Sequence, residues 1–200
     1  MKKLIFATNN PTKAKRFSNG LTAKGIEVQS LKDVNIKLNV EENGDTAIEN
    51  ALIKARECYL KLKEPVIAMD DSLYLENVPD EKQPGLYVRR VAGKSLSDDE
   101  MIKYYTNLVK EFGKNGKIDC KWIYGLAVID KNGNESTYTW EKVGIYMVDK
   151  VNSTINPGYP LNSITKYKYI DKYLTETTEK DLEKIEVNED DVVDFIARHI

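Results

Sequence analysis

The sequence predicts an α/β fold, in which strands and helices alternate along the first half of a chain of 200 residues. Short apolar runs typical of buried strands occupy residues 4–8, 26–31 and 66–69. Segments with helical periodicity, at 13–23 and 46–62, separate these runs. A long alternating stretch at 118–149 is typical of a β-hairpin and adds further strands to the second half.

The first strand leads into a helix expected at residues 13–23. Asn10 is a good N-cap and Pro11 suits the first helical position, where its missing N–H would have no partner. A helix N-terminus offers backbone N–H groups and a positive dipole end to an anion. The loop contains no glycine, which excludes a Walker-type loop. We expect its polar side chains to contact phosphate groups: Thr8, Asn9, Asn10 and Lys13.

The helix expected at 46–62 has a defined start and a defined face. Thr46 and Glu49 have the spacing of a capping box, which satisfies two N–H groups at a helix start. Apolar residues then recur at alternating spacings of four and three: Ile48, Leu52, Ala55, Tyr59 and Leu62. This stripe is expected to lie against the sheet.

Carboxylates gather on both sides of that helix. Asp70-Asp71 follows the apolar strand 66–69, and neighbouring side chains on a strand point to opposite faces. One aspartate can therefore face a site while the other lies in the scaffold. Glu41 and Glu42 stand in the loop before the helix. Oxygen ligands from a strand end and a loop suit a hard cation such as Mg²⁺, so the pattern indicates chemistry on a phosphate.

The second half combines a helix, a hairpin and a final helix. The helix is expected at 97–112, with Met101, Tyr105, Leu108 and Phe112 on one stripe. Asn132-Gly133 is a hairpin turn signal within 118–149. The Tyr- and Lys-rich segment 166–174 is expected to form a half-exposed surface. The acids at 188–191 favour a helix start after them, since negative charge stabilises that end of the helix dipole.

Composition limits the class of protein. The net charge is −2 and no basic stripe with interleaved aromatics occurs, so we expect no nucleic-acid partner. No stretch approaches the length of a membrane span, so we expect no membrane partner either. Cys58 and Cys120 lack metal-ligand spacing and are typical of buried thiols in a reducing compartment, which makes the cytoplasm the expected location. The length suggests one domain over residues 1–200.

Four motifs occur in a fixed order along the first half of the chain. They are Thr8-Asn9-Asn10 with Lys13; Glu41-Glu42-Asn43-Gly44-Asp45-Thr46 with Glu49-Asn50-Ala51; Asp70-Asp71-Ser72; and Pro84-Gly85-Leu86-Tyr87-Val88-Arg89-Arg90. Over roughly residues 1–155 the chain thereby resembles the inosine/xanthosine triphosphate pyrophosphatase family, also called the Ham1-like family. The resemblance implies a central mixed sheet flanked by helices, with two lobes and a cleft.

The resemblance also implies an activity. It is the Mg²⁺-dependent hydrolysis of a nucleoside triphosphate to the monophosphate and pyrophosphate, with Mn²⁺ as the alternative metal. Glu42 and Asp71 match the family's metal ligands, and Asp71 matches its catalytic acid. The matching substrate-binding residues are Thr8, Asn9, Asn10, Lys13, Ser72, Arg90 and Tyr159. A homodimer is a possible assembly that the sequence does not fix.

The second half departs from the family pattern. Pro157-Gly158-Tyr159-Pro160 stands for the family's Phe-Gly-Tyr-Asp-Pro, the late Ser-His-Arg that reads the purine is missing, and position 73 is Leu instead of Gly. Two alternatives therefore stay open: a nucleotide-binding module with altered or lost catalysis, and a pyrophosphatase with another base preference. We expect at most a weak preference for inosine over adenosine triphosphate.

Overall fold

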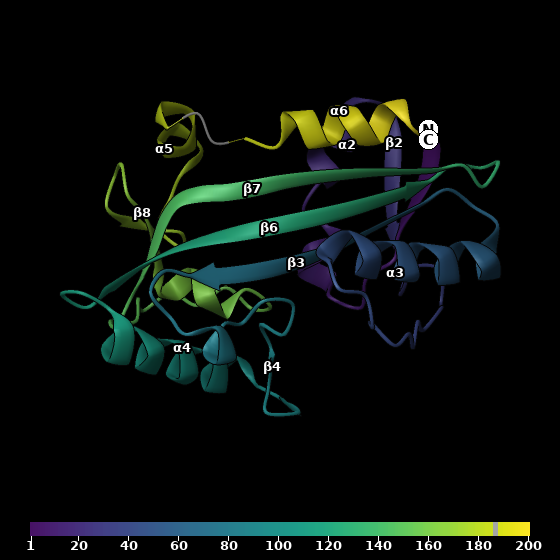
Figure 1. Cartoon of the computed structure of the whole chain (residues 1–200). Helices are drawn as coiled ribbons and strands as arrows, with labels where there is room; N and C mark the ends of the chain where they lie inside the picture. Colours follow the sequence, from purple (N-terminus) through teal and green to yellow (C-terminus); the bar gives the residue numbers. More distant parts are fainter. Residues whose placement is uncertain (186–187) are drawn as a thin grey trace. The chain divides into compact units, whose positions relative to one another are not determined.

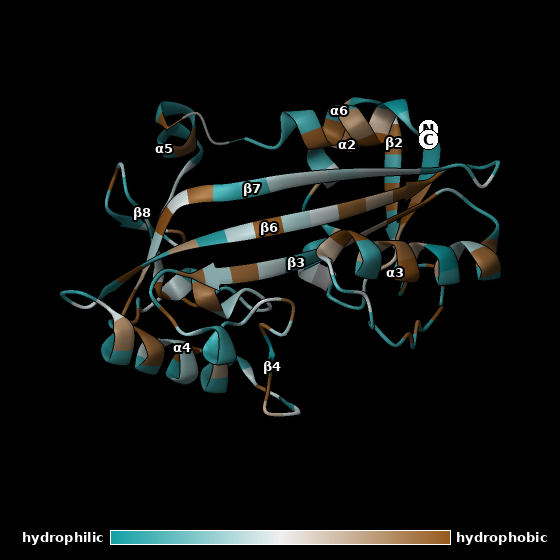
Figure 2. Ribbon diagram, viewed as in Figure 1, coloured by the Kyte–Doolittle hydropathy of each residue, from teal (hydrophilic) through white to brown (hydrophobic). Residues whose placement is uncertain are grey.

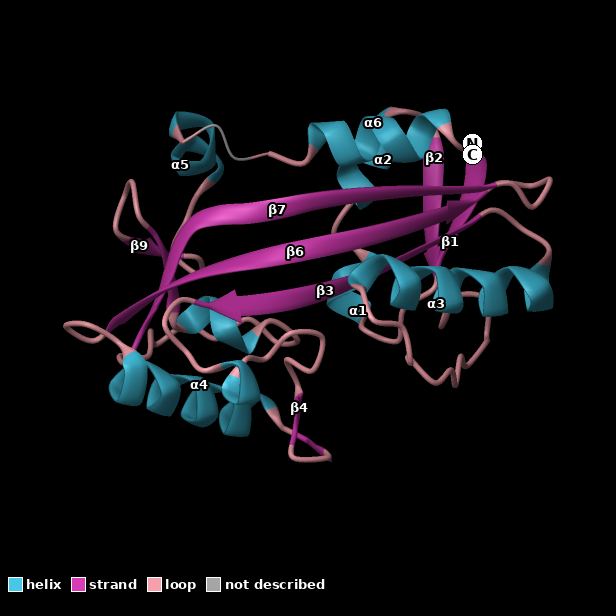
Figure 3. Ribbon diagram, in the orientation of Figure 1, coloured by secondary structure: helices cyan, strands magenta, loops and turns pink. Residues whose placement is uncertain are grey.

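The computed structural model describes residues 1–185 and 188–200 and has the expected mixed α/β architecture. Seven strands form one hydrogen-bonded sheet in the order β2-β1-β3-β6-β7-β8-β9, and helices flank it (Figure 3). By its internal contacts the chain divides into two compact units, in agreement with the two lobes that were expected. Unit 1 comprises residues 1–71, 124–140 and 189–200, and unit 2 comprises residues 72–123 and 141–188.

Parallel strands form the start of unit 1. β1 (Lys2–Phe6) pairs with β2 (Ile26–Ser30) along its whole length, and its last two residues pair with β3 (Val66–Leu75). The prediction of a single helix at residues 13–23 is wrong. Two short helices occur instead, α1 (Pro11–Ala14) and α2 (Ser18–Ala23), joined by backbone hydrogen bonds between residues three apart. The break falls at residues 15–17, and the weak helix formers Ser18, Asn19 and Gly20 form the first turn of α2 after it.

Helix α3 (Ala47–Leu62) begins with the expected capping box, in which Thr46 and Glu49 satisfy each other's backbone N–H groups. The face that it buries differs from the expected stripe. The buried residues are Ala47, Asn50, Ala51, Ala55 and Cys58, while Leu52, Tyr59 and Leu62 are only partly buried against the same core. The small side chains at the centre of this face allow α3 to lie close to the sheet.

The close approach of α3 also explains a glycine in the sheet. Gly125 lies on β6 (Lys117–Ile129), and a Cβ atom there would overlap the backbone of Ala47 and Ile48 at the start of α3. Figure 2 shows hydrophobic and hydrophilic residues alternating along α3, as expected for a helix with one face on a core. The glycine is therefore a packing requirement.

Strand β3 is longer than the sequence predicted. It runs through Asp70 and Asp71 to Leu75, so the expectation that it ends at residue 69 is wrong. Leu73 and Leu75 are buried apolar residues that continue the strand, and Leu73 exchanges two backbone hydrogen bonds with Gly85. The two aspartates therefore lie within the strand, where each pairs with a lysine.

The hairpin in the second half is confirmed. β6 and β7 (Glu135–Val148) flank a turn in which Asp130 accepts hydrogen bonds from Asn132 and Asn134. The first half of β6 alternates in burial, and from Tyr124 onward every residue is buried because side chains on both faces pack into cores.

Unit 2 has its own core, built around helix α4 (Asp98–Phe112) (Figure 1). Met101, Tyr105 and Leu108 are buried on the expected stripe, and Phe112 packs against it. The remaining elements of this unit are short: β4 (Arg90–Val91), β5 (Lys94–Ser95), β8 (Thr165–Tyr167), β9 (Lys172–Tyr173), α5 (Glu179–Lys184) and the 3₁₀ turns Asp80–Lys82 and Pro160–Ser163. The Tyr/Lys-rich segment forms the small hairpin β8–β9, which is half-exposed as expected.

Helix α6 (Asp190–Arg198) returns to unit 1, as the acids before it predicted. It packs against α2 at Gly20, where a Cβ atom would lie only 3.0 Å from the side chain of Val193. No helix in the described part of the chain is both long and apolar enough to cross a membrane.

Candidate active site

The loop after β1 is braced by its own side chains. The side-chain oxygen of Asn10 accepts from two backbone N–H groups in the first turn of α1, at 2.9 and 3.3 Å. Thr8 accepts from the backbone N–H of Asn10 at 3.1 Å, and the amide of Asn9 donates to the carbonyl of Leu38 at 3.1 Å. The backbone N–H groups that the sequence assigned to a phosphate are thus bonded within the loop, and phosphate contact by these three side chains stays a prediction.

Lys13 extends from α1 to the sheet. Its ammonium group forms a hydrogen-bonded ion pair with the carboxylate of Asp71 on β3, and both side chains are mostly buried. Two of the predicted site residues, far apart in sequence, therefore meet. The pair places a positive charge beside the carboxylate that the sequence assigned to catalysis.

A second lysine joins the other two carboxylates. The ammonium of Lys54 on α3 lies 3.1 Å from an oxygen of Glu42 and 3.1 Å from an oxygen of Asp70. Sequence reasoning missed Lys54. The sequence feature that could have revealed it is its spacing. Lys54 lies four residues after Asn50, which places the two side chains on one face of the helix.

Asn50 explains why Glu42 lies where it does. The side chain of Asn50 is buried, and its oxygen accepts from the backbone N–H of Gly44 at 2.9 Å. The loop that carries Glu42 is thereby fixed to the start of α3. The Glu-Asn-Ala motif thus has a structural role in which Glu49 caps the helix and Asn50 holds the acidic loop.

The two aspartates face opposite sides of β3 and have opposite electrostatic environments. Burial raises the pKa of Asp70, and the negative charges of Asp71 and Glu42 add to the rise against the opposing charge of Lys54. Burial also favours a higher pKa for Asp71, but the charge and hydrogen bond of Lys13, together with the charges of Arg16 and Lys54, outweigh it and hold that pKa below its ordinary value. The structure therefore favours an ionised Asp71. We refer to Lys13, Glu42, Lys54, Asp70 and Asp71 as the carboxylate cluster.

A second group of side chains in unit 1 was missed by sequence reasoning. Arg16 donates from Nε to both carboxylate oxygens of Glu189 at 3.0 Å, and its Nη2 also bonds that carboxylate. Its guanidinium carbon lies 4.3 Å from the ring centroid of Tyr124 and 5.6 Å from that of Trp140. These rings stack with centroids 4.9 Å apart. We call Arg16, Tyr124, Trp140 and Glu189 the arginine cluster.

Three of the predicted substrate-binding residues belong to unit 2. Ser72 is buried, and its hydroxyl donates to the backbone carbonyl of Ile123 at 3.5 Å. Tyr159 is half-buried in a turn, where its backbone N–H bonds the carbonyl of Asn156. Arg90 is exposed, with its guanidinium 5.6 Å from the ring centroid of Tyr87.

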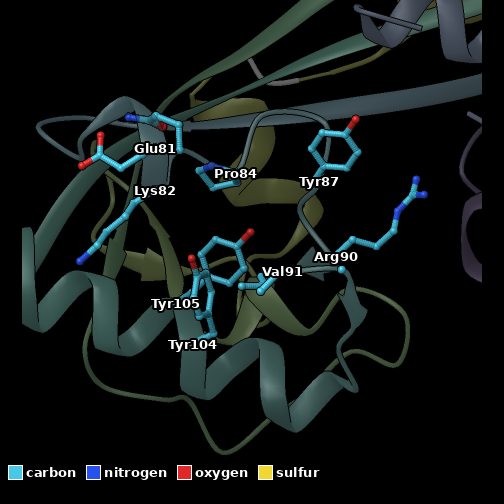
Figure 4. Close-up of a pocket in the computed structure, with 11 residues that line it drawn as sticks. Glu81, Lys82, Pro84, Tyr87, Arg90, Val91, Tyr104 and Tyr105 are labelled. Atoms are coloured by element: carbon cyan, nitrogen blue, oxygen red, sulfur yellow. The ribbon is translucent and has the colours of Figure 1, made fainter. Parts of the chain in front are cut away.

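Arg90 and Tyr87 also line a pocket of about 540 Å³ within unit 2, together with Tyr104 and Tyr105 of α4 (Figure 4). The hydroxyl of Tyr105 donates to the carbonyl of Val88 at 2.8 Å, so this ring forms a fixed wall. Among the described residues, Arg90 and Lys82 are the cations of the pocket, Glu81 is its one lining carboxylate, and the rest of the wall is largely aromatic.

Comparison with known proteins connects these features to a family. The chain matches the Ham1 family over residues 4–159. It is 31% identical to a Bacillus subtilis (strain 168) protein named dITP/XTP pyrophosphatase over 185 residues, which are 92% of this chain and 90% of that protein. It is 39% identical to a protein of the same name from Thermoanaerobacter sp. (strain X514) over 108 residues, about half of each chain (54%).

Two solved structures share the fold. The Ham1 protein of Staphylococcus aureus superimposes with a TM-score of 0.73 at 20% identity and covers 100% of both chains. A HAM1 protein from Coxiella burnetii superimposes with a TM-score of 0.70 at 19% identity, over 99% of this chain and 98% of that one. At these identities the likeness supports the fold.

Proposed function

This chain belongs to the Ham1 family, and we propose that it is a nucleoside triphosphate pyrophosphatase that converts a nucleoside triphosphate and water to the monophosphate and pyrophosphate. The names of its relatives suggest inosine- and xanthosine-type nucleotides as substrates. The observation that carries the proposal is the carboxylate cluster, in which three carboxylates and two lysines of unit 1 lie together. A pure nucleotide binder would have no need for carboxylates beside a polyanion.

The carboxylate cluster suits a divalent metal. The donors are all carboxylate oxygens, and Glu42 and Asp70 already share one cation in the ammonium of Lys54. Among residues 1–185 and 188–200, no group of three or more His, Cys, Asp or Glu side chains is arranged as a complete metal site. Mg²⁺ typically takes one or two protein carboxylates and completes its shell with waters and substrate phosphates. We propose Glu42 and Asp71, which match the family's metal ligands, as the ligands, with Mn²⁺ as an alternative metal. In this structure Lys54 joins Glu42 to Asp70, whereas Asp71 pairs with Lys13, so a shared metal would have to rearrange these ion pairs.

The metal, the two lysines and Asp71 have separate proposed roles. When bound, Mg²⁺ supplies charge neutralisation for the phosphate chain and acidifies water. Lys13 and Lys54 provide further positive charge for phosphate oxygens, and most of the rate is expected from positioning and charge neutralisation. Asp71, kept ionised by Lys13, accepts the proton of the water that attacks the α-phosphorus. The bond to the bridging oxygen then breaks, and pyrophosphate leaves.

The test measures pyrophosphate release from a panel of nucleoside triphosphates, with Mg²⁺, with Mn²⁺ and with a chelator. We expect release with either metal and none in the chelator. Full turnover in the chelator would remove the metal from the mechanism. Nucleotide binding without any release, under all conditions, would identify the chain as a binding module with lost catalysis.

Neighbouring glutamates provide a matched pair of variants. Glu42→Gln should raise the Mg²⁺ concentration needed for half-maximal activity, because Glu42 loses a charged oxygen in the cluster. Glu41→Gln should leave it unchanged, since Glu41 is exposed on the same loop. Equal effects of the two substitutions would argue against Glu42 as a ligand.

A further inference from the structure

Two of the predicted substrate-binding residues of unit 2 lie on separate segments of the chain. Arg90 begins the small hairpin β4–β5, and Tyr159 directly precedes the 3₁₀ turn Pro160–Ser163. Helix α4 lies beside both segments, because Tyr105 bonds the carbonyl of Val88 and the 3₁₀ turn packs against the helix. A side chain at the start of α4 is therefore able to reach both.

Asp98, the first residue of α4, makes both contacts. One of its carboxylate oxygens accepts a hydrogen bond from Nη2 of Arg89 at 2.7 Å, and the other accepts from the backbone N–H of Gly158 at 3.3 Å. Each bond is made to the residue directly before a predicted substrate contact, Arg90 in the first case and Tyr159 in the second. One carboxylate thus connects the two segments.

Arg89 transmits the first contact to the hairpin. Its Nη1 donates to the carbonyl of Leu96 at 3.0 Å, while its own carbonyl accepts from the N–H of Leu96 at 2.8 Å. It thereby closes the base of β4–β5, in which Arg90 pairs with Ser95. The planar guanidinium donates in fixed directions, so two acceptors hold it in one orientation. The position of Arg90 therefore depends on the ion pair between Arg89 and Asp98.

The second contact fixes the conformation of a turn. Gly158 has a φ of 82°, which glycine adopts without strain. The next residue, Tyr159, donates its backbone N–H to the carbonyl of Asn156 at 2.9 Å. A hydrogen bond to an ionised acceptor is stronger than one to a neutral acceptor. The carboxylate of Asp98 therefore helps to hold the turn that sets the direction of Tyr159.

We propose that Asp98 is a positioning residue for substrate binding, which holds the segments of Arg90 and Tyr159 in the conformations that bind a nucleotide. The inference deepens the proposed function and rests on it for the roles of these two residues. Asp98 itself makes no contact with substrate. The carboxylate cluster, to which we assign the chemical step, lies in unit 1. Loss of Asp98 should therefore raise KM and leave kcat nearly unchanged.

The kinetic experiment measures KM and kcat for inosine triphosphate. The ion pair is partly exposed, with 39% of the Arg89 side chain and 35% of the Asp98 side chain accessible, so the effect should be moderate. We expect Asp98→Ala to raise KM by about three- to tenfold, as for the net loss of a hydrogen bond or two. Asp99→Ala is the matched control. It removes the same charge from the first turn of α4 at an exposed position, so KM should stay at the wild-type value.

Hydrogen exchange followed by mass spectrometry tests the connection without any nucleotide. Asp98→Ala should accelerate exchange in two separate segments, residues 84–96 and residues 155–163. Asp98→Asn keeps an acceptor for the N–H of Gly158 but loses the charge opposite Arg89, so it should accelerate exchange in residues 84–96 alone. This variant keeps the size of the side chain, and it serves as the test where Asp98→Ala folds poorly. Asp99→Ala should match the wild type in both segments.

The two measurements separate the inference from the proposed function. If the wild type hydrolyses no nucleotide, the proposed function fails, and calorimetric binding of inosine triphosphate then replaces KM. Acceleration in one segment or in neither in Asp98→Ala would overturn the inference. A fall in kcat at unchanged KM would also overturn it, as would an effect of Asp99→Ala on KM equal to that of Asp98→Ala.

Discussion

Asp70 and Asp71 are neighbours in sequence that face different partners. Strand alternation turns Asp70 toward Lys54 and Asp71 toward Lys13, so the two carboxylates do not depend on a single cation. The result is a pKa raised for Asp70 and lowered for Asp71. Titratable groups whose environments push their pKa values apart commonly take different roles in a reaction. Asp71, whose lowered pKa favours the carboxylate, is the member of the pair that stays ionised over the wider range of pH.

Replacement of Asp71 tests that role. Asp71→Asn removes the charge and the proton acceptor while keeping the size of the side chain, and we expect kcat to fall by at least about a hundredfold. Steady-state pyrophosphate release measures it. Asp45→Asn, at an exposed position of the acidic loop, is the control and should behave as the wild type. Near-normal turnover of Asp71→Asn would assign the base to another group.

Replacement of Lys13 should weaken the binding of all nucleotides equally. Lys13→Ala removes a charge that we assign to the phosphate chain, which carries no base information, so binding should weaken alike for every base. Because Lys13 lowers the pKa of Asp71, its loss should raise that pKa and move the acidic limb of the pH–rate profile to higher pH. Lys15→Ala, exposed at the end of α1, should show neither change. A changed base preference with unweakened binding would contradict the assignment.

At the scale of helices and strands, local signals predicted where elements begin. The capping box at Thr46 predicted the start of α3, because this signal acts within four residues, and the structure shows a second capping box at Ser97 at the start of α4. Boundaries that depend on partners distant in sequence were wrong or missed. Asp70 and Asp71 lie within β3, where lysines from α1 and α3 pair with them, and nothing in the local sequence of the strand indicates those lysines.

The same physical limit applies to the site. Lys13, Asp71 and Glu42 were predicted as site residues because each lies in a short motif. The contacts of Arg16 could not be predicted, since its carboxylate partner lies 173 residues away in sequence and its ring partners lie on β6 and β7. The role of such a half-buried arginine becomes clear only once the fold supplies its neighbours.

Gly125 gives a prediction for the packing of α3 on the sheet. Gly125→Ala places a Cβ atom into the backbone at the start of α3, and we expect a loss of about 1–3 kcal/mol in the free energy of unfolding, as for overpacked cores. Urea denaturation monitored by circular dichroism measures it. Thr137→Ala, exposed on β7, should change stability by less than about 0.5 kcal/mol. An unchanged midpoint for Gly125→Ala would mean that α3 can shift away without cost.

At the scale of the whole molecule, each unit has its own core and one buried cysteine within it. Cys58 packs in the core of unit 1 and Cys120 in the core of unit 2, and both are free thiols. Burial raises the pKa of Cys58 to about 11 and that of Cys120 to about 12. At neutral pH both groups are therefore protonated as well as covered, and each can report on the opening of its own unit.

Labelling with a thiol reagent should accordingly be slow for both cysteines in the native protein near pH 7, because only the thiolate reacts. The reactive fraction rises with pH toward the raised pKa values, so labelling should accelerate in alkaline solution. In a urea series the single-cysteine variants Cys120→Ala and Cys58→Ala would give the opening of unit 1 and unit 2 separately. Immediate labelling of either thiol at pH 7 without urea would show that its core is open.

Unit 1 draws its strands and helices from three separated segments of the chain, and that pattern has a consequence for synthesis on the ribosome. Its sheet cannot be completed until residues 124–140 have emerged, and α6 with Glu189 must wait for residues 189–200. Contacts between segments so far apart close slowly, because the entropy of a long loop is lost before the contacts form. The arginine cluster would therefore be among the last parts of a nascent chain to assemble, after the carboxylate cluster, whose residues all lie within the first segment.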